Sequence, residues 1–527
     1  MAMATISYRG ARRAKSLAYF SLEDNKFKLQ SPQISNVSFA ASAFPAVLLL
    51  VLVGYGLMAR PLFFGEPAIP LEVVFTFAAA GAIAQLLWLG FSWDLIQQSI
   101  IARLSRALPA IFILFAIGLL VGAWMVSGTI PMLVDWGVRL IDPDWIYALA
   151  FVVPAIFSTL TGTSWGSAGT IGVVIMGVGA SLGADIAIVA GAVIGGAYFG
   201  DKLSPLSDTT NMAAIAAEAP LFDHIRAMLW TTVPSACIAL LAYTLIGLLM
   251  PLEGGASDPE GIRAFLAGLE SQFNYHPVLL LPPAVVLFGS LRRYPTLPVL
   301  LASILTATAL GILLQSFALV DVLRSLTTGF SLSMGSGIAV PDAVRVLVER
   351  GGLYSMREAI FVALLVYLFI GAIDLLNTMP RVVGRIFAFA KGRAATVLAA
   401  LGAAAATNAM TSNQSATAFI VGDAFGRRFD ALGIPRPILS RSIEDTGTMI
   451  EPLIPWHATA LFMVATLGVP VADYWHWQLL SLTNFIIAPL LAITGIGCFY
   501  GKGIKSTSAS SPDATDESSP TRLEPHP

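Results

Sequence analysis

The sequence predicts an all-α polytopic membrane protein that contains inverted-topology repeats with broken or re-entrant helices. Of its 527 residues, 56% are hydrophobic and 12% are charged, which is about half the charged share of a soluble domain. The hydrophobic residues form runs of about 20, the length that a helix needs to cross the hydrocarbon core of a bilayer. Polar segments interrupt these runs in both halves of the chain, in matching order.

This composition excludes several classes of protein. A soluble enzyme of this size needs a more highly charged surface, and a net charge of -2 gives no bias toward a polyanion such as nucleic acid. Cys237 and Cys498 lie far apart in hydrophobic runs, so neither a disulfide framework nor a metal cluster is expected. We expect a lipid bilayer as the main partner, no nucleic acid and no bound cofactor.

Eight hydrophobic runs are long enough to be membrane spans. They cover residues 38–58, 71–92, 108–128, 146–162, 227–250, 294–317, 357–378 and 476–500. Shorter or glycine-rich runs are expected to be broken or re-entrant segments, because irregular backbone at membrane depth is found only where it lines a protein cavity. These shorter runs cover residues 167–180, 184–200, 276–289, 394–410 and 456–470.

The spans and the polar stretches between them divide the chain into five parts. They are a polar N-terminal segment at 1–37, a first membrane repeat at 38–250, an external loop at 251–275, a second, inverted repeat at 276–500, and a disordered tail at 501–527. Basic residues near the N-terminus place that end in the cytoplasm. Arg427, Arg428, Arg436 and Arg441 would then be external, which contradicts the same rule.

Two polar segments of the first half have counterparts in the second half. Residues 161–167 and 200–211 are followed by 407–415 and 440–448. Thr163 and Thr411 are 248 residues apart, and Asp208 and Asp445 are 237 apart, so the spacing indicates a duplication. An inverted repeat places a substrate site near the bilayer midplane, at the broken helices.

The polar segments supply candidate ligands for a small cation and a proton. A carboxylate at this depth needs a compensating charge, and a hard cation that prefers oxygen ligands competes with a proton for it. Asp208 is the first candidate for carrying both, as a ligand of transported Na⁺ and as a proton carrier, and Asp445 is its repeat mate. The other candidates for the cation- and proton-binding site are Asp201, Glu444, Thr163, Ser164, Asn211, Asn408, Asn413 and Thr446.

These segments resemble the NhaC-type sodium/proton antiporter family. The resemblance rests on GTSWG at 162–166, GGAYFGDKLSPLSDTT at 195–210, LSR at 439–441, EDTGT at 444–448 and PLIPW at 452–456, and it covers roughly residues 38–500. It implies exchange of Na⁺ (or Li⁺) for H⁺ across the bacterial inner membrane by alternating access. The wider ion transporter superfamily implies an elevator-like division into scaffold and transport parts, and a homodimer.

Two positions depart from the family pattern. His457 follows Trp456 where the resemblance implies an amide, and Asn413 stands before Gln414 where it implies an acid. An unperturbed histidine titrates near neutral pH, so His457 is a candidate pH sensor, and a hydrogen-bonded histidine at a helix start is the alternative. The missing acid leaves open a second cargo, namely Na⁺- or H⁺-coupled exchange of organic acids or amino acids, of the malate/lactate type.

An enzymatic alternative is an intramembrane aspartyl hydrolase that uses Asp201 and Asp208. Two acids that share a proton support such chemistry. The Gly-x-Gly-Asp context is absent, however, because Tyr198 and Phe199 precede Gly200. We therefore expect a transporter and not an enzyme.

Overall fold

The computed structural model describes residues 37–250, 259–335, 337–387 and 390–499, and every regular element in these ranges is a helix. Nine of these helices are long and apolar enough to cross a membrane, or up to twelve if each of three bent helix pairs is counted as one span. The prediction of an all-α polytopic protein with broken helices is confirmed. The predicted segments at 1–37 and 501–527 and the start of the 251–275 loop lie almost wholly outside the described residues.

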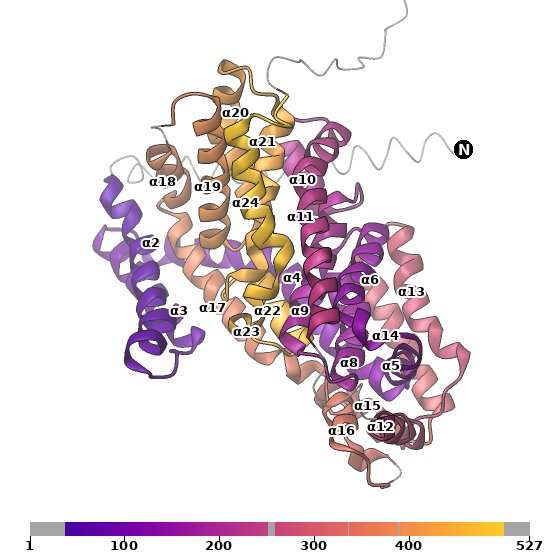
Figure 1. The fold of residues 1–527 in the computed structure, drawn as a ribbon. Coiled ribbons are helices and arrows are strands. Elements are labelled where there is room, and N and C mark those ends of the chain that lie inside the picture. The colour runs from indigo at the N-terminus through magenta and orange to yellow at the C-terminus, as the bar shows by residue number, and fades with distance from the viewer. Residues whose placement is uncertain (1–36, 251–258, 336, 388–389, 500–527) are drawn as a thin grey trace, which may run out of the picture.

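The described residues of the first half form ten α-helices, most of which are labelled in Figure 1. They are α2 (Phe39–Val53), α3 (Leu71–Trp88), α4 (Trp93–Val126), α5 (Thr129–Leu140), α6 (Ile146–Thr161), α7 (Ser164–Ser167), α8 (Val173–Ser181), α9 (Ile186–Leu203), α10 (Asp208–Ala216) and α11 (Leu221–Leu249). Two π-helical segments, η2 (Gly54–Phe64) and η4 (Ala168–Gly172), continue α2 and α7.

The second half begins with α12 (Pro259–Gln272), a helix inside the segment that the sequence predicts as an external loop. It is followed by α13 (Leu281–Leu291), α14 (Thr296–Leu314), α15 (Leu319–Thr328), α16 (Asp342–Val348), α17 (Arg357–Asp374), α18 (Thr378–Ile386), α19 (Arg393–Thr411), α20 (Gln414–Ala431), α21 (Arg436–Ser442), α22 (Ala458–Leu467), α23 (Val471–Tyr474) and α24 (Leu479–Thr494). The π-helical segment η8 (Ile443–Thr448) and the short η9 (Glu451–Leu453) continue α21.

Two of the runs that the sequence predicts to be broken are continuous helices. The runs at 184–200 and 394–410 form α9 and α19, of 18 and 19 residues. Glycine and alanine lower the hydropathy of these helices without breaking them, because small residues in a membrane helix serve close helix packing. A carbon atom added at Gly196 would overlap the carbonyl oxygen of Phe151 on α6, so α6 and α9 approach each other at van der Waals contact.

The helix ends reveal a repeat with a constant offset of 250 residues. Gly162 and Ser412, which follow α6 and α19, both have left-handed backbone, with φ of 70° and 47°. Gly183 and Gly433, which precede α9 and α21, also do, with φ of 73° and 62°. Left-handed backbone is rare outside glycine, so its recurrence at one spacing marks equivalent positions in two repeats.

Side-chain caps repeat at the same offset. Thr163 and Asn413 each accept a hydrogen bond from the backbone N–H three residues later. Ser207 and His457 each cap the helix that follows, α10 and α22. The pairing of Asp208 with Asp445 is therefore wrong, because the residue 250 positions after Asp208 is Ala458. Thr163 likewise corresponds to Asn413 and not to Thr411, which lies only 248 residues after it.

The two repeats pack against each other reciprocally and in opposite orientation. Helix α10 packs on α20, and its equivalent α22 packs on α7, η4 and α8, the equivalents of α20. The second contact includes a stack of Trp165 on Phe462, with ring centroids 4.4 Å apart. Figure 1 shows α10 and α20 at the upper end of the molecule and α8 and α22 toward the lower end. Equivalent elements therefore point toward opposite ends, as an inverted repeat requires.

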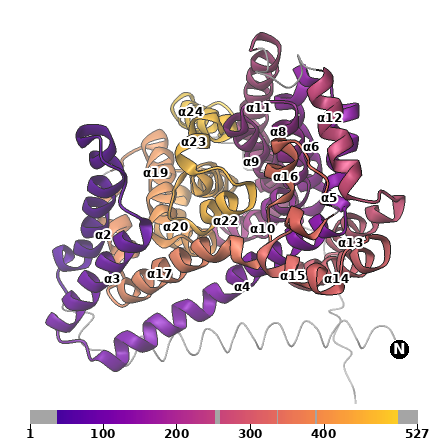
Figure 2. The same cartoon turned by 90° about the horizontal axis from the view of Figure 1, so that it is seen from below.

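One helix from each repeat, α4 and α17, forms one side of the molecule. Figure 2 shows α4 and α17 lengthwise and side by side, at a large angle to the upright helices α19 and α24. Ser99 on α4 donates a hydrogen bond to the carbonyl of Gly371 on α17, with an O–O distance of 2.6 Å. The pair forms a continuous flank against which the broken helices lie.

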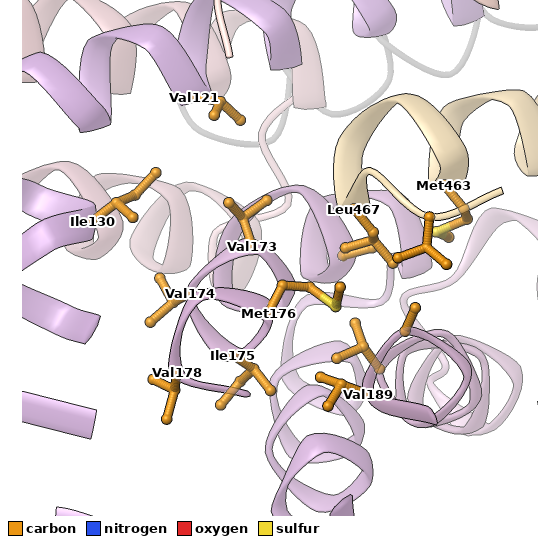
Figure 3. Packing of buried hydrophobic residues seen from close by; sticks show 14 of the residues in the cluster. Val121, Ile130, Val173, Val174, Ile175, Met176, Val178, Val189, Met463 and Leu467 are labelled. Carbon is orange, nitrogen blue, oxygen red and sulfur yellow. The ribbon is translucent and has the colours of Figure 1, made fainter. Parts of the chain in front are cut away.

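The core beneath the breaks is apolar and interlocks the repeats. Figure 3 shows Met176 on α8 beside Val189 on α9 and Leu467 on α22, all of which belong to one buried cluster. Close packing of this kind holds membrane helices together, since lipid gives no hydrophobic driving force between them. The polar residues of the helix breaks are thus enclosed by tightly packed apolar walls.

Candidate cation and proton site

The site is built around Asp201, near the end of α9. The Asp201 side chain is buried, and Ser164 Oγ at the start of α7 donates to its Oδ2 at 2.7 Å. The chain then leaves the helix at Ser204 and resumes at α10, so the polar backbone is exposed to the interior at this break. Thr210 Oγ1 donates to the carbonyls of Asp201 and Lys202. This contact replaces part of the helical hydrogen bonding that the carbonyl groups lose at the break.

Glu451 is the repeat equivalent of Asp201 and holds the matching position in the second half. Its buried carboxylate accepts hydrogen bonds from Asn408 Nδ2 at 3.1 Å, Tyr198 Oη at 3.0 Å and Thr459 Oγ1 at 3.0 Å. Tyr198 lies on α9, so the first repeat donates directly to the acid of the second. The two halves thus meet at a carboxylate.

Asn408 links Glu451 to the break at His457. Its amide nitrogen also donates to the carbonyl of Gly447 at 2.6 Å and to Gln414 Oε1 at 3.1 Å. His457 Nδ1 accepts from the backbone N–H of Thr459, so Nε2 carries the proton and donates to Asn408 Oδ1 at 3.2 Å. His457 is therefore a neutral helix cap in this conformation, while its role as a pH sensor stays a prediction.

Asp445 forms an ion pair at the centre of the protein. Lys202 Nζ lies 2.6 Å from Asp445 Oδ1, and the two side chains are 0% and 1% exposed. Arg441 Nε lies 3.6 Å from Asp445 Oδ2, and Thr231 Oγ1 on α11 donates to Oδ1 at 2.7 Å. Asn484 on α24 donates to the backbone carbonyl of Asp445 at 2.7 Å and lies 3.5 Å from Oδ1. Side chains from four helices thus surround Asp445.

Glu444 is the least satisfied acid of the site. It is 0% exposed, Thr448 Oγ1 donates to its Oε2 at 2.6 Å, and its Oε1 has no hydrogen-bond partner. Asp445, the next residue, is the partner of Lys202. The site thus contains three buried carboxyl groups without a cationic partner within salt-bridge distance among the described residues, namely Asp201, Glu444 and Glu451.

The remaining predicted residues have other positions. Asp208, the first candidate, is exposed at the start of α10. Asn211 donates to the carbonyls of Pro205 and Ser207 and braces the loop before α10. Thr446 Oγ1 donates to the carbonyl of Leu401 on α19. Thr163 caps the start of α7, and Asn413 caps the start of α20.

Several members of the site escape the sequence reasoning. Lys202, which is not among the candidates, contacts Asp445 of the other repeat. Thr231 and Asn484 lie in runs that are predicted to be ordinary spans, and Tyr198 lies in the 195–210 motif but is not singled out as a ligand. The pair of Leu-Gly steps at 182–183 and 432–433, one repeat apart, is the signal that equates Asp201 with Glu451.

An all-helical polytopic protein with inverted repeats and buried charges at paired helix breaks is an ion-coupled membrane transporter by architecture. The chain belongs to the Na⁺/H⁺ antiporter family, because the model of that family matches residues 196–496 and relatives match over most of their length. The NhaC resemblance is thereby confirmed.

Three relatives illustrate the range of the family. The chain is 36% identical to an uncharacterized Na⁺/H⁺ antiporter of Haemophilus influenzae, over 86% of this chain and 95% of the relative. It is 36% identical to the Na⁺/H⁺ antiporter NhaC of Alkalihalophilus pseudofirmus, over 82% and 91%. It is 28% identical to the malate-2H⁺/Na⁺-lactate antiporter of Bacillus subtilis, over 79% and 87%. Identity is higher to the relatives named for Na⁺/H⁺ exchange.

Proposed function

We propose that this protein exchanges Na⁺ (or Li⁺) for H⁺ by alternating access. The observation that carries the proposal is the burial of three acids at the helix breaks, Asp201, Glu444 and Glu451, here named the buried acid set. Lys202, the buried cation that follows Asp201 in the chain, is paired with Asp445. The higher identity to relatives named for Na⁺/H⁺ exchange supports the same function.

Electrostatics explains why such a set exchanges a cation for protons. Like charges buried close together in a medium of low dielectric constant cannot all be ionised. Lys202 is already paired with Asp445, so the acid set holds protons when no metal cation is present. A Na⁺ ion that enters supplies positive charge and allows a proton to leave, and a returning proton expels the ion.

The ligands for Na⁺ are hard oxygen atoms that the helix breaks expose. Carboxylates, hydroxyls and free carbonyls bind such cations, and Ser164 with Asp201, and Thr448 with Glu444, combine an acid and a hydroxyl. Asp208 lies at the exposed start of α10. We therefore place it at the entrance of the ion pathway and not among the ligands of the bound Na⁺. Asp445 stays a ligand only in states in which Lys202 leaves it.

The charge distribution suggests an orientation in the bacterial inner membrane. Helices α18, α20 and α21 lie at the upper end in Figure 1, and they carry Arg381, Arg385, Arg427, Arg428 and Arg436. Positive residues favour the cytoplasmic side, so we assign this end, where α2 also begins, to the cytoplasm. The exception noted for the arginines of 427–436 then disappears. An elevator motion and a homodimer belong to the same proposal.

The test is cation-driven proton movement in proteoliposomes that carry a pH dye. Addition of NaCl or LiCl to vesicles with an acidic interior is expected to alkalinise the interior, and KCl is expected to have no such effect. Chain with Asp201→Asn, Glu444→Gln and Glu451→Gln together, matched in amount and monodispersity, serves as the control. A Na⁺ response that is absent from the unaltered protein from pH 6 to 9, or that survives in the triple variant, contradicts the proposal.

One observation favours a second cargo, a small carboxylate. A cavity of about 340 Å³ lies between α4, α17 and the start of α20, and its lining includes Arg103, Arg106 and Ser415. Guanidinium groups beside a helix N-terminus suit a carboxylate. Uptake of labelled malate, lactate and amino acids, compared with Arg103→Gln, tests this candidate. Failure of every solute to exchange removes it.

A further inference from the structure

Arg103 is a buried cation on α4 to which the exchange of Na⁺ for H⁺ described above gives no role. Its side chain is 8% exposed, and its Nη2 donates to the carbonyl oxygen of Thr411 at 2.7 Å. The acid within salt-bridge distance is Asp374, whose Oδ2 lies 3.8 Å from Nη1 and whose side chain is 42% exposed. Ionisable groups inside a membrane protein are costly and mark functional positions by default, so the short contact with Thr411 calls for a reason.

Thr411 lies at the tip of a helical hairpin. It is the last residue of α19, and the next two residues turn the chain into α20. We name α19 and α20 the second hairpin, and we name its repeat equivalent, α6 with α7, η4 and α8, the first hairpin. Asn408, about one helical turn before Thr411, donates to Glu451 at 3.1 Å. Arg103 is thus connected, through the tip of the second hairpin, to an acid of the exchange site.

The first hairpin is packed against its neighbours without free space. A carbon atom added at Gly169 would overlap Ile117 on α4, and one added at Gly177 would overlap Val134 on α5. The position equivalent to the α4 arginine, 250 residues later, is Leu353. Close packing, and not an arginine, therefore holds the first hairpin on α4 and α5.

The second hairpin borders a cavity instead. The cavity of about 340 Å³ between α4, α17 and the start of α20 is lined by Arg103, Arg106, Tyr367 and Ser415, among others. Arg106 and Ser415 are exposed, and charged side chains at membrane depth face the protein interior or water, so this cavity is open to water. Protein interiors contain few voids larger than a water molecule, so packing does not fix the hairpin on this side. Arg103 holds it there.

The tip has a second anchor at the break before α22. The backbone N–H of Ala458 donates to Ser412 Oγ at 2.9 Å, and Trp456 Nε1 donates to the carbonyl of Ala409 at 2.8 Å. The break before α22 belongs to the same repeat as the tip, whereas Arg103 belongs to the other repeat. Movement between the repeats at this point therefore has to break the contact of Arg103.

We propose that Arg103 is a latch that holds the second hairpin in the conformation in which Asn408 donates to Glu451. This inference rests on the proposed alternating access. When the latch opens, the tip moves into the cavity, withdraws Asn408 and connects Glu451 to the water of the cavity. A guanidinium group suits this role because it stays charged at every physiological pH and presents its donors in a fixed plane. Release is then a movement and not a deprotonation, and Arg103 is a positioning residue that acts through the tip.

The first test freezes the tip by a bridge across the cavity. Ala107 on α4 and Ser415 on α20 both line it, so Ala107→Cys and Ser415→Cys are joined by a bifunctional maleimide with a cleavable spacer, in a Cys237→Ser background. We expect Na⁺/H⁺ exchange and ²²Na⁺/Na⁺ exchange to fall about ten-fold or more, because closing and opening motions gate turnover, and to recover on cleavage. Equilibrium binding of ²²Na⁺ is expected to stay within about two-fold. The single-cysteine variants treated with the same reagent are the controls.

The second test removes the latch. Arg103→Leu installs the residue of the equivalent repeat position, and spin labels at Ala102→Cys on α4 and Ser415→Cys on α20, both exposed positions, report the distance between the flank and the tip. We expect a second, different distance to appear in Arg103→Leu. The control is Arg350→Leu, which removes a half-buried arginine that donates to the carbonyl of Val346, four residues earlier. It is expected to leave the distance distribution unchanged.

Three results overturn the latch. They are an unchanged exchange rate in the bridged protein, loss of ²²Na⁺ binding together with exchange, which means that the bridge blocks the site, and an unchanged distance distribution in Arg103→Leu. If Arg103→Leu does not fold, Arg103→Lys, which keeps the charge and loses the planar fork, takes its place in the distance measurement. The assays contain no organic acid, so a carboxylate in the cavity cannot cause these effects. Absence of Na⁺/H⁺ exchange in the unaltered protein refutes the proposed function, while the distances still decide whether Arg103 holds the tip.

Discussion

Lys202 and Asp445 approach to 2.6 Å in a pocket where both side chains are almost completely buried, and they come from opposite repeats. Such a pair forms at a large desolvation penalty, so it is weak evidence for stability on its own. The pair is important because of where it lies. Asp445 is on the π-helical segment η8, next to Glu444, and the Oε1 atom of Glu444 has no hydrogen-bond partner. The pair sets the electrostatic balance of the acids around it.

Replacing one partner of this pair is expected to destabilise the protein. In Asp445→Asn the ammonium of Lys202 stays buried without a carboxylate, which costs about 3–5 kcal/mol of the free energy of unfolding, and Na⁺/H⁺ exchange is lost. Thermal unfolding in detergent and transport in proteoliposomes measure the two effects. Addition of Lys202→Met is expected to recover part of the stability and none of the transport.

Asp430→Asn is the matched control for this change. Asp430 pairs with Arg436 at 2.7 Å, but its side chain is 55% exposed, and pairs of this kind contribute about 0–1 kcal/mol. An Asp445→Asn protein that unfolds at the same temperature as Asp430→Asn would show that the buried pair is not the electrostatic centre described here.

Glu444→Gln is expected to separate stability from activity. The amide carbonyl keeps the hydrogen bond from Thr448, and the amide imitates the protonated, neutral carboxyl group without being able to release a proton. We expect the free energy of unfolding to stay within about 1 kcal/mol of that of the unaltered protein and Na⁺/H⁺ exchange to be abolished. Unfolding temperature and vesicle alkalinisation check both, with the exposed Glu358→Gln as the control. A destabilised but active variant argues against a role in exchange.

Two aspartates near the α9–α10 break are expected to respond differently to the same change. Asp208→Asn alters an exposed side chain, and we expect stability within about 0.5 kcal/mol of the unaltered protein and a transport rate within about two-fold. Asp201→Asn alters a buried acid bonded to Ser164, and we expect transport to fall about ten-fold or more. Rates of Na⁺-driven alkalinisation rank the two. The reverse ranking would restore Asp208 as the carrier.

The contact between α6 and α9 predicts a steric effect remote from the ion. A methyl group at Gly196 would overlap the carbonyl of Phe151, so Gly196→Ala is expected to lower the free energy of unfolding by about 1–3 kcal/mol. Gly54→Ala is the control, since a methyl group there meets nothing within 4 Å. The unfolding temperatures of the two variants measure this effect. Equal temperatures would mean that α6 and α9 can move apart to accommodate the methyl group at little cost.

Much of the fold and part of the site follow from local sequence. Seven of the eight long runs lie on single helices that are long and apolar enough to cross a membrane, because length and hydrophobicity decide whether a segment suits the bilayer. The eighth, 476–500, contains α24, which is one half of a helix pair bent by 53°. Ser164, Asp201, Glu444 and Asp445 are found because buried charge and hydroxyl groups at a helix break are conspicuous in an apolar chain. Glu451 is not among the predicted candidates, because an acid directly before a proline is also typical of an ordinary first helical turn.

By itself, the sequence determined that the chain is helical, membrane-spanning and duplicated, since hydrophobic length and paired polar breaks are local properties of the chain. Only the tertiary structure decided that Asp201 is equivalent to Glu451, that Asp208 lies at the surface, and that Lys202 neutralises Asp445. The physical reason is that burial and ion pairing depend on which helices pack together. The same stretch of residues faces the interior or the surface according to neighbours more than 200 positions away.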